Sequence, residues 1–517
     1  LQHIAGDKAA RDLFDGVELS WRRVPNGAAI GDLLAQASRD FNPVDPSAIV
    51  PKLLDARVKL AARQDQTKDH WVTIKLRELD ETIVLCAGLF VDFHADREFL
   101  TPGSTAKTTL TVLNRSKLPL TWNGKPLPPN QPVTESQDWS VPATMSVSQP
   151  YWLMEPKQRN GAIYSISDPQ MLGEAENLPI RSTTITLSFN GQNFQITRPL
   201  RHRFVDRIEG ELVRAVKIAP VVAVRVSDAV LLFPNTASRR VSVEVKSNIG
   251  KAAGSVKLRL PSGWRSEPAE HNFSLSTLGE LAGFTFNVTP PAAESVGTLT
   301  AIATVDGREI SAGMETIKYS HIEPQTLFPR AEARLIRSNV NISAKKVGYI
   351  VGAGDEVPAA LSQLGVSVTI LDPASLATAE LGSFDAIITG VRAYNSRPDL
   401  RANQSRLLDY VNKGGTLIVQ YNIYEASFFG GARGDLARVG PYAIKIGRER
   451  VTVEEAPVTF PAVDHPLLQY PNQIKPADFD GWVQERGLYF ASEWDAQYQP
   501  LFATNDPGEA VQKGGTL

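Results

Sequence analysis

The sequence of 517 residues contains a single cysteine, Cys86, so it cannot form a disulfide bond within the chain. Its seven histidines are scattered singly, and no two of them stand at the spacing of metal ligands. A hydrolytic zinc ion needs three converging ligands, usually His and Asp, and an open position for water. We therefore expect no metal site in this chain.

An excess of charge is also missing, because 54 basic residues are balanced by 56 acidic ones. Such a chain has no general electrostatic attraction to nucleic acid or to a membrane surface. No apolar run reaches the roughly 18 to 20 residues of a membrane span. We expect neither a nucleic-acid partner nor a membrane span. The composition, 42% hydrophobic and 21% charged, is that of a folded chain, and its length predicts several domains.

Residues 1–86 show the spacing of helices. Ile30, Leu33 and Ala37 recur at helical intervals, a second run follows Asp45-Pro46, and a third helix is expected at about 69–87. This stretch has no strand pattern. We interpret it as the helical tail of a preceding domain together with a connector.

From residue 87 the pattern changes to the alternation of β-strands, and two all-β domains are expected, at 87–210 and 211–322. Asn190-Gly191 separates two alternating runs between Ile185 and Ile196, which predicts a type I′ hairpin. Valines alternate with polar residues over 241–246. Short strands divided by Pro, Gly and Asn favour a β-sandwich in each domain.

After an expected linker at 323–345, strands and helices alternate through 346–517. The predicted strands are 347–351, 366–371, 385–389 and 417–420, with helices at about 356–364 and 399–412. Because parallel strands need crossover connections, this alternation predicts a doubly wound α/β domain of flavodoxin type. The final residues 513–517 repeat Lys413-Gly414-Gly415-Thr416-Leu417, so a further strand is expected to start at Thr516 and the domain to continue beyond Leu517.

Polar residues follow the strands of this α/β domain. In open α/β sheets ligands bind beyond the carboxyl ends of the strands. That edge gathers seven candidate ligand-binding residues: Asp355, Glu356, Arg392, Tyr394, Asn395, Gln420 and Asn422. Their hydrogen-bonding groups suit a sugar or another small polar ligand. The same residue types also form turns and helix caps, so a structural role is the alternative.

Two other patterns of this domain bear on ligand binding. Gly352-Ala353-Gly354 superficially resembles a dinucleotide fingerprint, but Asp355 and Glu356 at the helix start would repel a pyrophosphate. We therefore expect no dinucleotide cofactor. Five aromatic residues also surround Gln484-Glu485-Arg486: Trp482, Tyr489, Phe490, Trp494 and Tyr498. Aromatic rings stack on sugars, but a packed core is the expected role of most of these five.

Several stretches are similar to a known family. They are Asp15-Gly16, Trp21, Arg23-Val24-Pro25 and residues 346–350, 352–358, 389–395, 480–490 and 505–509. Together they resemble the C-terminal part of long bacterial deacetylases of the PIG-L/LmbE type. Residues 260–264 and 288–291 resemble the NPCBM-associated β-sandwich of secreted glycan-acting proteins. The α/β layout resembles class I glutamine amidotransferase-like domains and their trehalose-utilisation relatives.

The resemblance implies a preceding catalytic domain that uses zinc and a His-Pro-Asp-Asp motif to deacetylate an amino sugar. The one His-Pro pair here, His465-Pro466, is followed by Leu467-Leu468, so no catalytic residue is carried over. No cysteine stands in the α/β domain, which excludes the thiolate chemistry of glutamine amidotransferases.

The chain is thus expected to be an accessory region without a catalytic residue or cofactor of its own. It would act as a spacer, dock on its own deacetylase domain or bind a glycan, and the resemblance implies a periplasmic or extracellular location. The alternatives are a sugar-acting α/β domain of the trehalose-utilisation type and a purely structural module.

Overall fold

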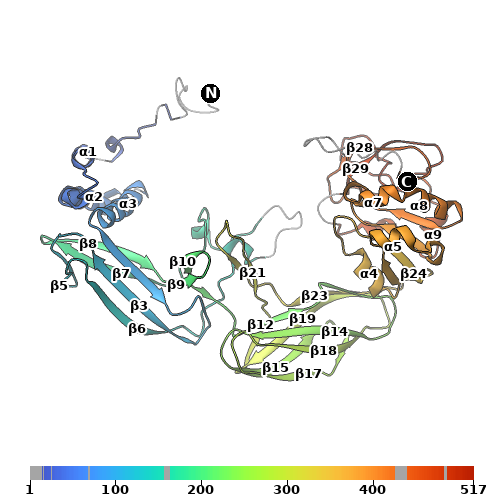
Figure 1. The fold of residues 1–517 in the computed structure, drawn as a ribbon, viewed down its shortest axis with the longest axis horizontal. Coiled ribbons are helices and arrows are strands. Elements are labelled where there is room, and N and C mark those ends of the chain that lie inside the picture. Colours follow the sequence, from blue (N-terminus) through green and yellow to red (C-terminus); the bar gives the residue numbers. More distant parts are fainter. Residues whose placement is uncertain are drawn as a thin grey trace. The chain divides into compact units, whose positions relative to one another are not determined.

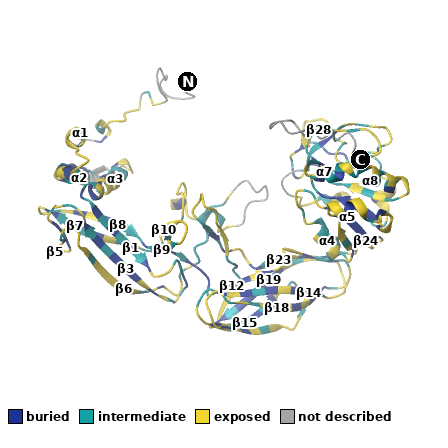
Figure 2. Cartoon of the chain, viewed as in Figure 1, coloured by how far each residue is buried: buried dark blue, intermediate teal, exposed yellow. Residues whose placement is uncertain are grey.

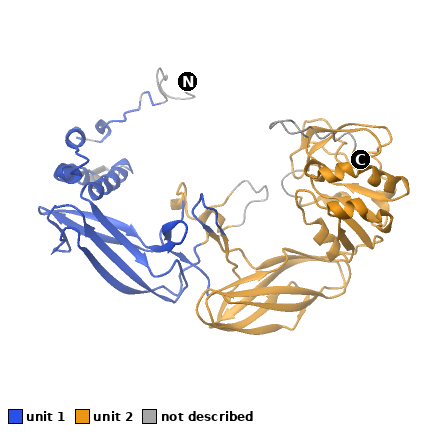
Figure 3. Ribbon diagram, in the orientation of Figure 1, with its two compact units in different colours: residues 1–148, 176–221, 317–325 blue, residues 149–175, 222–316, 326–517 orange. Residues whose placement is uncertain are grey.

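The computed structural model describes residues 14–15, 17–24, 26–67, 70–155, 164–424, 439–482 and 486–517. Gly16, Pro25 and Val483-Gln484-Glu485 of the family-like stretches lie outside these residues. The chain divides into two compact units, residues 1–148, 176–221 and 317–325 and residues 149–175, 222–316 and 326–517 (Figure 3). Most of the structure is β-sheet, arranged in several sheets (Figure 1). The chain is therefore multidomain and β-rich, as the sequence predicts.

The first unit begins with three helices, α1 (Ala28–Asp40), α2 (Val50–Thr67) and α3 (His70–Cys86). A 3₁₀ turn at Pro46–Ile49 leads into α2, as the Asp45-Pro46 pair predicts. The buried faces of these helices share one hydrophobic core with the first β-sandwich. Arg198 and Glu81 also join the sandwich to α3 through an ion pair of 2.6 Å. The helices are therefore part of the first unit and not a separate connector.

The first sandwich contains a five-stranded sheet of order β10-β9-β1-β3-β6 and a four-stranded sheet of order β5-β4-β7-β8. Their strands are β1 (Leu89–Ala95), β3 (Thr105–Asn114), β4 (Leu120–Trp122), β5 (Lys125–Pro126), β6 (Pro132–Ser140), β7 (Ser182–Phe189), β8 (Gln192–Pro199), β9 (Arg201–Asp206) and β10 (Gly210–Ala215). Alternate residues of β1 and β3 are buried (Figure 2). The predicted hairpin is confirmed, because Ile185 pairs with Ile196 across Asn190 and Gly191, whose φ angles are 48° and 79°. A short parallel pair, β2 (Phe99–Leu100) and β11 (Lys217–Ile218), completes this part.

The second sandwich has sheets of order β12-β14-β18-β16 and β13-β23-β19-β15-β17, with β20 paired to β19. Their strands are β12 (Val222–Val226), β13 (Val230–Phe233), β14 (Arg239–Ser247), β15 (Ala252–Arg259), β16 (Arg265–Glu267), β17 (Glu270–Leu275), β18 (Leu281–Thr289), β19 (Ser295–Val305), β20 (Arg308–Ile310) and β23 (Glu332–Arg337). The alternating valines of β14 are buried, as predicted.

Two expected boundaries differ in the structure. Residues 323–345, expected as a linker, contain β22 (Gln325–Leu327), which pairs with β21 (Glu315–Ile317), and β23. Strand β23 pairs with both β13 and β19, so the second sandwich extends to Arg337. The expected boundary at residue 211 falls inside β10, which pairs with β9 of the first sandwich. These pairings join segments that are distant in sequence, so local pattern does not mark them.

The last domain has a parallel sheet of order β25-β24-β26-β27 and an antiparallel pair of β28 and β29. Its strands are β24 (Lys346–Ile350), β25 (Ser367–Ile370), β26 (Ala386–Thr389), β27 (Thr416–Val419), β28 (Ile444–Val451) and β29 (Gly487–Trp494). Its helices are α4 (Val357–Gln363), α5 (Pro373–Thr378), α6 (Ala393–Ser396), α7 (Pro398–Ala402), α8 (Gln404–Asn412) and α9 (Pro466–Gln469).

Hydrophobic clusters that contain alternate residues of β24 and β26 surround the parallel sheet. The helix predicted at 399–412 is two helices that meet at Asn403. Thr516 and Leu517 are not part of a strand. No helix among the described residues is long and apolar enough to cross a membrane.

Candidate functional site

The seven candidate residues lie in three segments at the carboxyl edge of the parallel sheet. Asp355 and Glu356 follow β24, Arg392, Tyr394 and Asn395 follow β26, and Gln420 and Asn422 follow β27. Backbone hydrogen bonds hold the segments together, from Gly390 N to Ile350 O at 2.8 Å and from Arg392 N to Tyr421 O at 2.7 Å. The sequence therefore predicted their common location correctly.

Asp355 fastens two of these segments to each other. Its carboxylate accepts hydrogen bonds from Val357 N at 3.0 Å, from Val391 N at 3.1 Å and from the hydroxyl of Tyr349. Gln420 Nε2 donates to the same hydroxyl at 2.8 Å. Burial, and then the hydrogen bond to Asp355, raise the pKa of Tyr349 well above its usual value, so the phenol stays protonated and donates. The side chains of Asp355 and Gln420 thus form hydrogen bonds within the protein.

The backbones of this edge also approach each other closely. A Cβ atom at Gly352 would lie 2.1 Å from Val391 O. A Cβ atom at Gly390 would lie 2.9 Å from Asp355 Oδ2 and 3.0 Å from the Tyr349 hydroxyl. Only glycine allows this approach without displacing its neighbours. Gly352, one of the two glycines that resemble a nucleotide fingerprint, thus serves packing between strand ends.

Three further candidates have internal partners. Tyr394 is buried, donates from its hydroxyl to Gln404 Oε1 at 2.7 Å, and has its pKa raised to about 12 by burial. Asn395 exchanges two hydrogen bonds with the backbone of Ile423, at 3.0 and 3.2 Å. Asn422 Oδ1 accepts from Tyr394 N at 3.2 Å. These side chains position the segment after β27, which is the structural alternative considered from the sequence.

Arg392 differs from the other candidates. Its side chain is exposed, and no carboxylate among the described residues lies within ion-pair distance of it. The guanidinium lies over the ring of Tyr421, 5.8 Å from the ring centre. The Tyr421 ring stacks in turn on Tyr489, with centres 6.2 Å apart and planes 30° apart. We call Arg392, Tyr421 and Tyr489 the Arg392 cluster.

Backbone strain distinguishes this cluster within the part of the chain that the structure describes. Seven non-glycine residues there have a positive φ: Asn26, Asn123, Asn130, Asn190, Asp306, Arg392 and Tyr489. Asn and Asp tolerate this conformation, but for other residues it costs about 1 to 3 kcal/mol each. The two exceptions, Arg392 at 57° and Tyr489 at 59°, both contact Tyr421. Such strain collects at ligand sites. Sequence reasoning missed Tyr421 and grouped Tyr489 with core aromatics.

The remaining candidate, Glu356, is exposed at the start of α4, and its side chain forms no cap hydrogen bond. Over the described residues, no group of three or more His, Cys, Asp or Glu could hold a metal ion.

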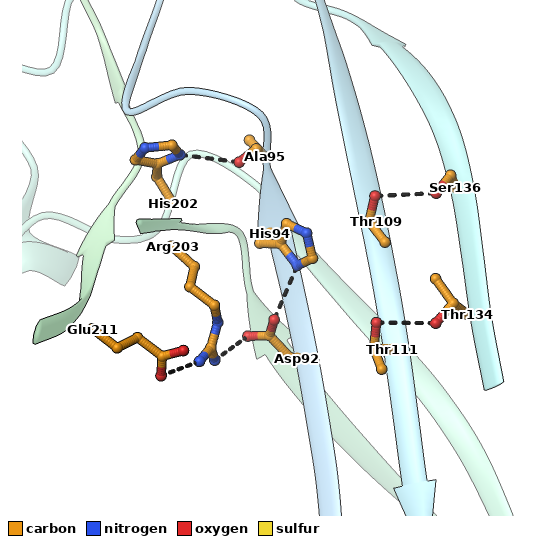
Figure 4. Close-up of polar contacts among 10 residues, drawn as sticks. All are labelled: Asp92, His94, Ala95, Thr109, Thr111, Thr134, Ser136, His202, Arg203 and Glu211. Carbon is orange, nitrogen blue, oxygen red and sulfur yellow. Dashed lines mark hydrogen bonds and ion pairs between the residues drawn. The ribbon is translucent and has the colours of Figure 1, made fainter. Parts of the chain in front are cut away.

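A second polar surface lies on the five-stranded sheet of the first sandwich (Figure 4). Asp92 on β1 lies 2.9 Å from His94 Nδ1 and accepts from Arg203 Nη2 at 3.1 Å, and Arg203 also binds Glu211. Beside them, the hydroxyls of Thr109 and Ser136 pair at 3.1 Å and those of Thr111 and Thr134 at 3.3 Å. The carboxylate, imidazole and hydroxyl groups named here are paired with one another or with Arg203, whereas Arg203 Nε has no partner among the described residues.

No family model and no curated protein matches this chain. Among solved structures, alpha-2-macroglobulin from E. coli is 10% identical, with 48% of this chain and 23% of that chain covered and a TM-score of 0.17. Salmonella alpha-2-macroglobulin is 9% identical, with 49% and 23% covered and a TM-score of 0.18. A family 123 glycoside hydrolase from Clostridium perfringens is 8% identical, with 38% and 37% covered and a TM-score of 0.14. The matched part spans less than a quarter of either macroglobulin, and these TM-scores carry no argument about function.

Proposed function

We propose that this chain is the accessory region of a PIG-L/LmbE-type, zinc-dependent N-acetyl-sugar deacetylase, and that its α/β domain binds a polar sugar at the Arg392 cluster. The observation that carries the binding site is the pair of strained residues on Tyr421. Holding Arg392 and Tyr489 at a positive φ lowers the stability of the fold. Contact with a ligand would explain why this strained conformation is kept.

The chemistry of the cluster suits a sugar. Tyrosine rings offer an apolar face for the C–H groups of a pyranose and a hydroxyl for hydrogen bonding. The exposed guanidinium of Arg392 offers several N–H donors to sugar hydroxyls and has no carboxylate partner among the described residues. Neither feature requires a metal ion or a nucleophile.

The position of the cluster supports the same proposal. The strand order β25-β24-β26-β27 corresponds to 2-1-3-4, the order of flavodoxin-type sheets. In such sheets ligands bind where the order reverses, which here lies between the ends of β24 and β26. Arg392 follows β26 directly at this switch point. An amidotransferase-like domain without its nucleophile would keep this crevice as a binding site.

Sugar binding is tested by calorimetric titration with N-acetylglucosamine, its oligomers, glucosamine and trehalose. We expect binding by the wild-type chain and a weakening of about tenfold or more in Tyr421→Ala. The matched control is Tyr424→Ala, because the ring of Tyr424 likewise lies under a guanidinium, 4.9 Å from the carbon of Arg448, and neither residue of that pair has a positive φ. No binding to any of these sugars, or equal weakening in both variants, would overturn the site.

The accessory role has a separate test. We expect no acetate release when the purified chain is incubated with zinc and N-acetylglucosamine oligomers, and release would contradict the role. Sequencing the genomic DNA upstream of the Leu1 codon is the matching genetic test. An in-frame His-Pro-Asp-Asp motif behind a signal peptide would support an exported deacetylase, and a start codon directly before Leu1 would contradict it.

The trehalose-utilisation alternative predicts turnover of a sugar by the chain alone. Arg392→Ala would be its informative variant, because the Arg392 side chain is exposed. Asn395→Ala is unsuitable, since Asn395 holds the backbone of Ile423 and its loss would disturb the segment after β27.

A further inference from the structure

A separate cavity of about 110 Å³ lies in the last domain, and its lining includes none of the three residues of the Arg392 cluster. Phe479, Trp482 and Phe502 contribute aromatic walls to it. Phe479 stacks on Trp482 with ring centres 5.5 Å apart and planes 7° apart, and meets Phe502 edge to face at 5.2 Å. Arg486 and Thr504 are polar residues that line the same space.

Arg486 brings a positive charge to this aromatic cavity. Its Nε donates to Ala456 O at 2.9 Å and its Nη1 to Phe479 O at 2.6 Å, so the guanidinium plane is fixed by two backbone carbonyls. Within the described residues, Nη2 has no acceptor and no carboxylate forms an ion pair with Arg486. A partly buried cation without a counter-ion is unfavourable, because two neutral carbonyl acceptors replace only part of the hydration that its charge has lost. An anion beside Nη2 would remove this cost.

Thr504 gives an independent observation. Its side chain is buried, with 9% of the residue exposed, and its Oγ1 has no hydrogen-bond partner among the described residues. Buried hydroxyls are normally paired, so an unpaired one at the wall of a cavity indicates a missing partner. A small side-chain rotation that turns Oγ1 toward the cavity would let a ligand oxygen supply the bond. The guanidinium of Arg486 and the hydroxyl of Thr504 would thus both be satisfied by an oxygen atom that accepts hydrogen bonds.

The size of the cavity limits what it holds. Pockets for drug-sized ligands measure about 300 to 1,000 Å³, so a cavity of 110 Å³ accepts a group of only a few non-hydrogen atoms. Aromatic walls favour an apolar end on that group, and Arg486 favours an oxygen anion at the other. We propose that this cavity binds a free short-chain monocarboxylate of the size of acetate. The site is independent of the sugar site proposed above.

The first test compares acetate with acetamide, a neutral ligand of the same shape, by saturation-transfer NMR on the wild-type chain. Four non-hydrogen atoms limit the affinity, so we expect an acetate dissociation constant on the order of 1 mM. Acetamide should bind about tenfold more weakly, because it cannot neutralise Arg486. Equal binding of the two ligands, or binding of neither, would overturn the proposal. Since neither probe contains a sugar ring, the outcome does not depend on the Arg392 cluster.

Variants locate the binding. Arg486→Gln should weaken acetate binding by about tenfold. The control Lys513→Gln, which removes the same charge from an exposed residue near Gln512 of the cavity wall, should change it by less than about twofold. Thr504→Val keeps the side-chain shape and removes the unpaired hydroxyl, so it should weaken acetate binding several-fold without lowering the thermal midpoint.

Unchanged acetate affinity in both Arg486→Gln and Thr504→Val would overturn the site. If Arg486→Gln does not fold, the acetate affinity of Thr504→Val and the comparison of acetate with acetamide still test the proposed site.

Discussion

The sheet face of the first sandwich and the Arg392 cluster of the last domain are both polar. On the sheet face, polar side chains bind one another, whereas the guanidinium of Arg392 has no carboxylate partner in the part of the chain that the structure describes. On the sheet face, Asp92 contacts His94 and Arg203, and the threonine hydroxyls bind across strands (Figure 4). At the Arg392 cluster the guanidinium lies over an aromatic ring, has no carboxylate partner among the described residues and is carried by a strained backbone. A ligand on the sheet face must compete with existing bonds, whereas a ligand at Arg392 need not.

This contrast shows why polarity alone is a poor guide to a binding site. Most of the candidate residues at the α/β edge behave like the sheet face, because Asp355, Asn395 and Asn422 satisfy backbone groups of neighbouring segments. The absence of a charged partner and the presence of backbone strain separate Arg392 from them. Changes that remove a paired group should therefore lower stability, and changes at Arg392 should mainly lower binding.

The largest effect is expected for Asp355→Ala. The substitution leaves Val357 N, Val391 N and the Tyr349 hydroxyl without their acceptor, so the free energy of unfolding should fall by about 3 kcal/mol. Urea unfolding measures it. The neighbouring control Glu356→Ala removes an exposed side chain without a cap bond and should change stability by less than about 0.5 kcal/mol. Similar losses in the two variants would show that Asp355 does not hold the edge together.

A pH-dependent effect is expected at Asp506. Burial raises the pKa of this carboxyl, but hydrogen bonds from Val453 and Thr452 and the charge of Arg450 outweigh burial and lower the pKa below its usual value. Its stabilising contribution is therefore present above the unfolded pKa of about 3.9 and is lost as the pH falls through the lower folded value. At neutral pH, Asp506→Asn should cost about 2 kcal/mol, because the bonds are to a charged acceptor.

Urea unfolding of the wild type and of Asp506→Asn between neutral pH and pH 3 measures this difference. The difference between the two proteins should start to shrink below about pH 4 and should vanish only as the pH falls through the lowered folded pKa, where the wild-type carboxyl becomes protonated. A difference that stays constant over this range would assign the effect to packing and not to charge. Asp409→Asn, which changes an exposed carboxylate paired with Lys413 along α8, serves as control and should cost only a few tenths of a kcal/mol.

A smaller and opposite effect is expected for Arg392→Gly. Glycine adopts a positive φ without strain, so stability should rise by about 1 kcal/mol after the entropy cost of glycine is subtracted. Sugar binding should be lost together with the guanidinium. Thermal unfolding and calorimetric titration measure the two changes. The control Asn190→Gly lies at a φ that asparagine already tolerates and should alter stability by only a few tenths of a kcal/mol. A less stable Arg392→Gly protein would mean that the arginine acts structurally.

The sequence predicted what depends on local pattern. The alternation in β14, the Asn190-Gly191 hairpin and the four parallel strands after residue 346 follow from periodicity and turn chemistry, whereas α5, α6, α9, β28 and β29 were not predicted. The position of the candidate residues followed from the rule that loops after parallel strands meet at one edge. The roles of those residues did not follow, because Asn395 and Asn422 find their partners in another segment of the folded chain.

The Arg392 cluster could not be predicted from the sequence for a related reason. Neither arginine nor tyrosine favours a positive φ, so the sequence carries no signal for the strain at Arg392 and Tyr489. Tyr421 stands between the candidates Gln420 and Asn422, but its contact with Tyr489 arises only through the fold. The extent of the second sandwich was missed likewise, since β23 is recognised as a strand of that sheet only by its pairing with β13 and β19.

The smallest effect is expected on the sheet face, for Thr111→Val. Valine keeps the β-branched shape, and Thr134 is exposed and exchanges its lost bond for one with water, so stability should change by less than about 0.5 kcal/mol. A double-mutant cycle with Thr134→Val should give a coupling of a few tenths of a kcal/mol in urea unfolding. A coupling above about 1 kcal/mol would mean that the hydroxyl rows are held more firmly than a solvated surface requires. In that case the pairing of polar groups on the sheet face would no longer distinguish it from a binding surface. Backbone strain alone would then distinguish the Arg392 cluster from the sheet face.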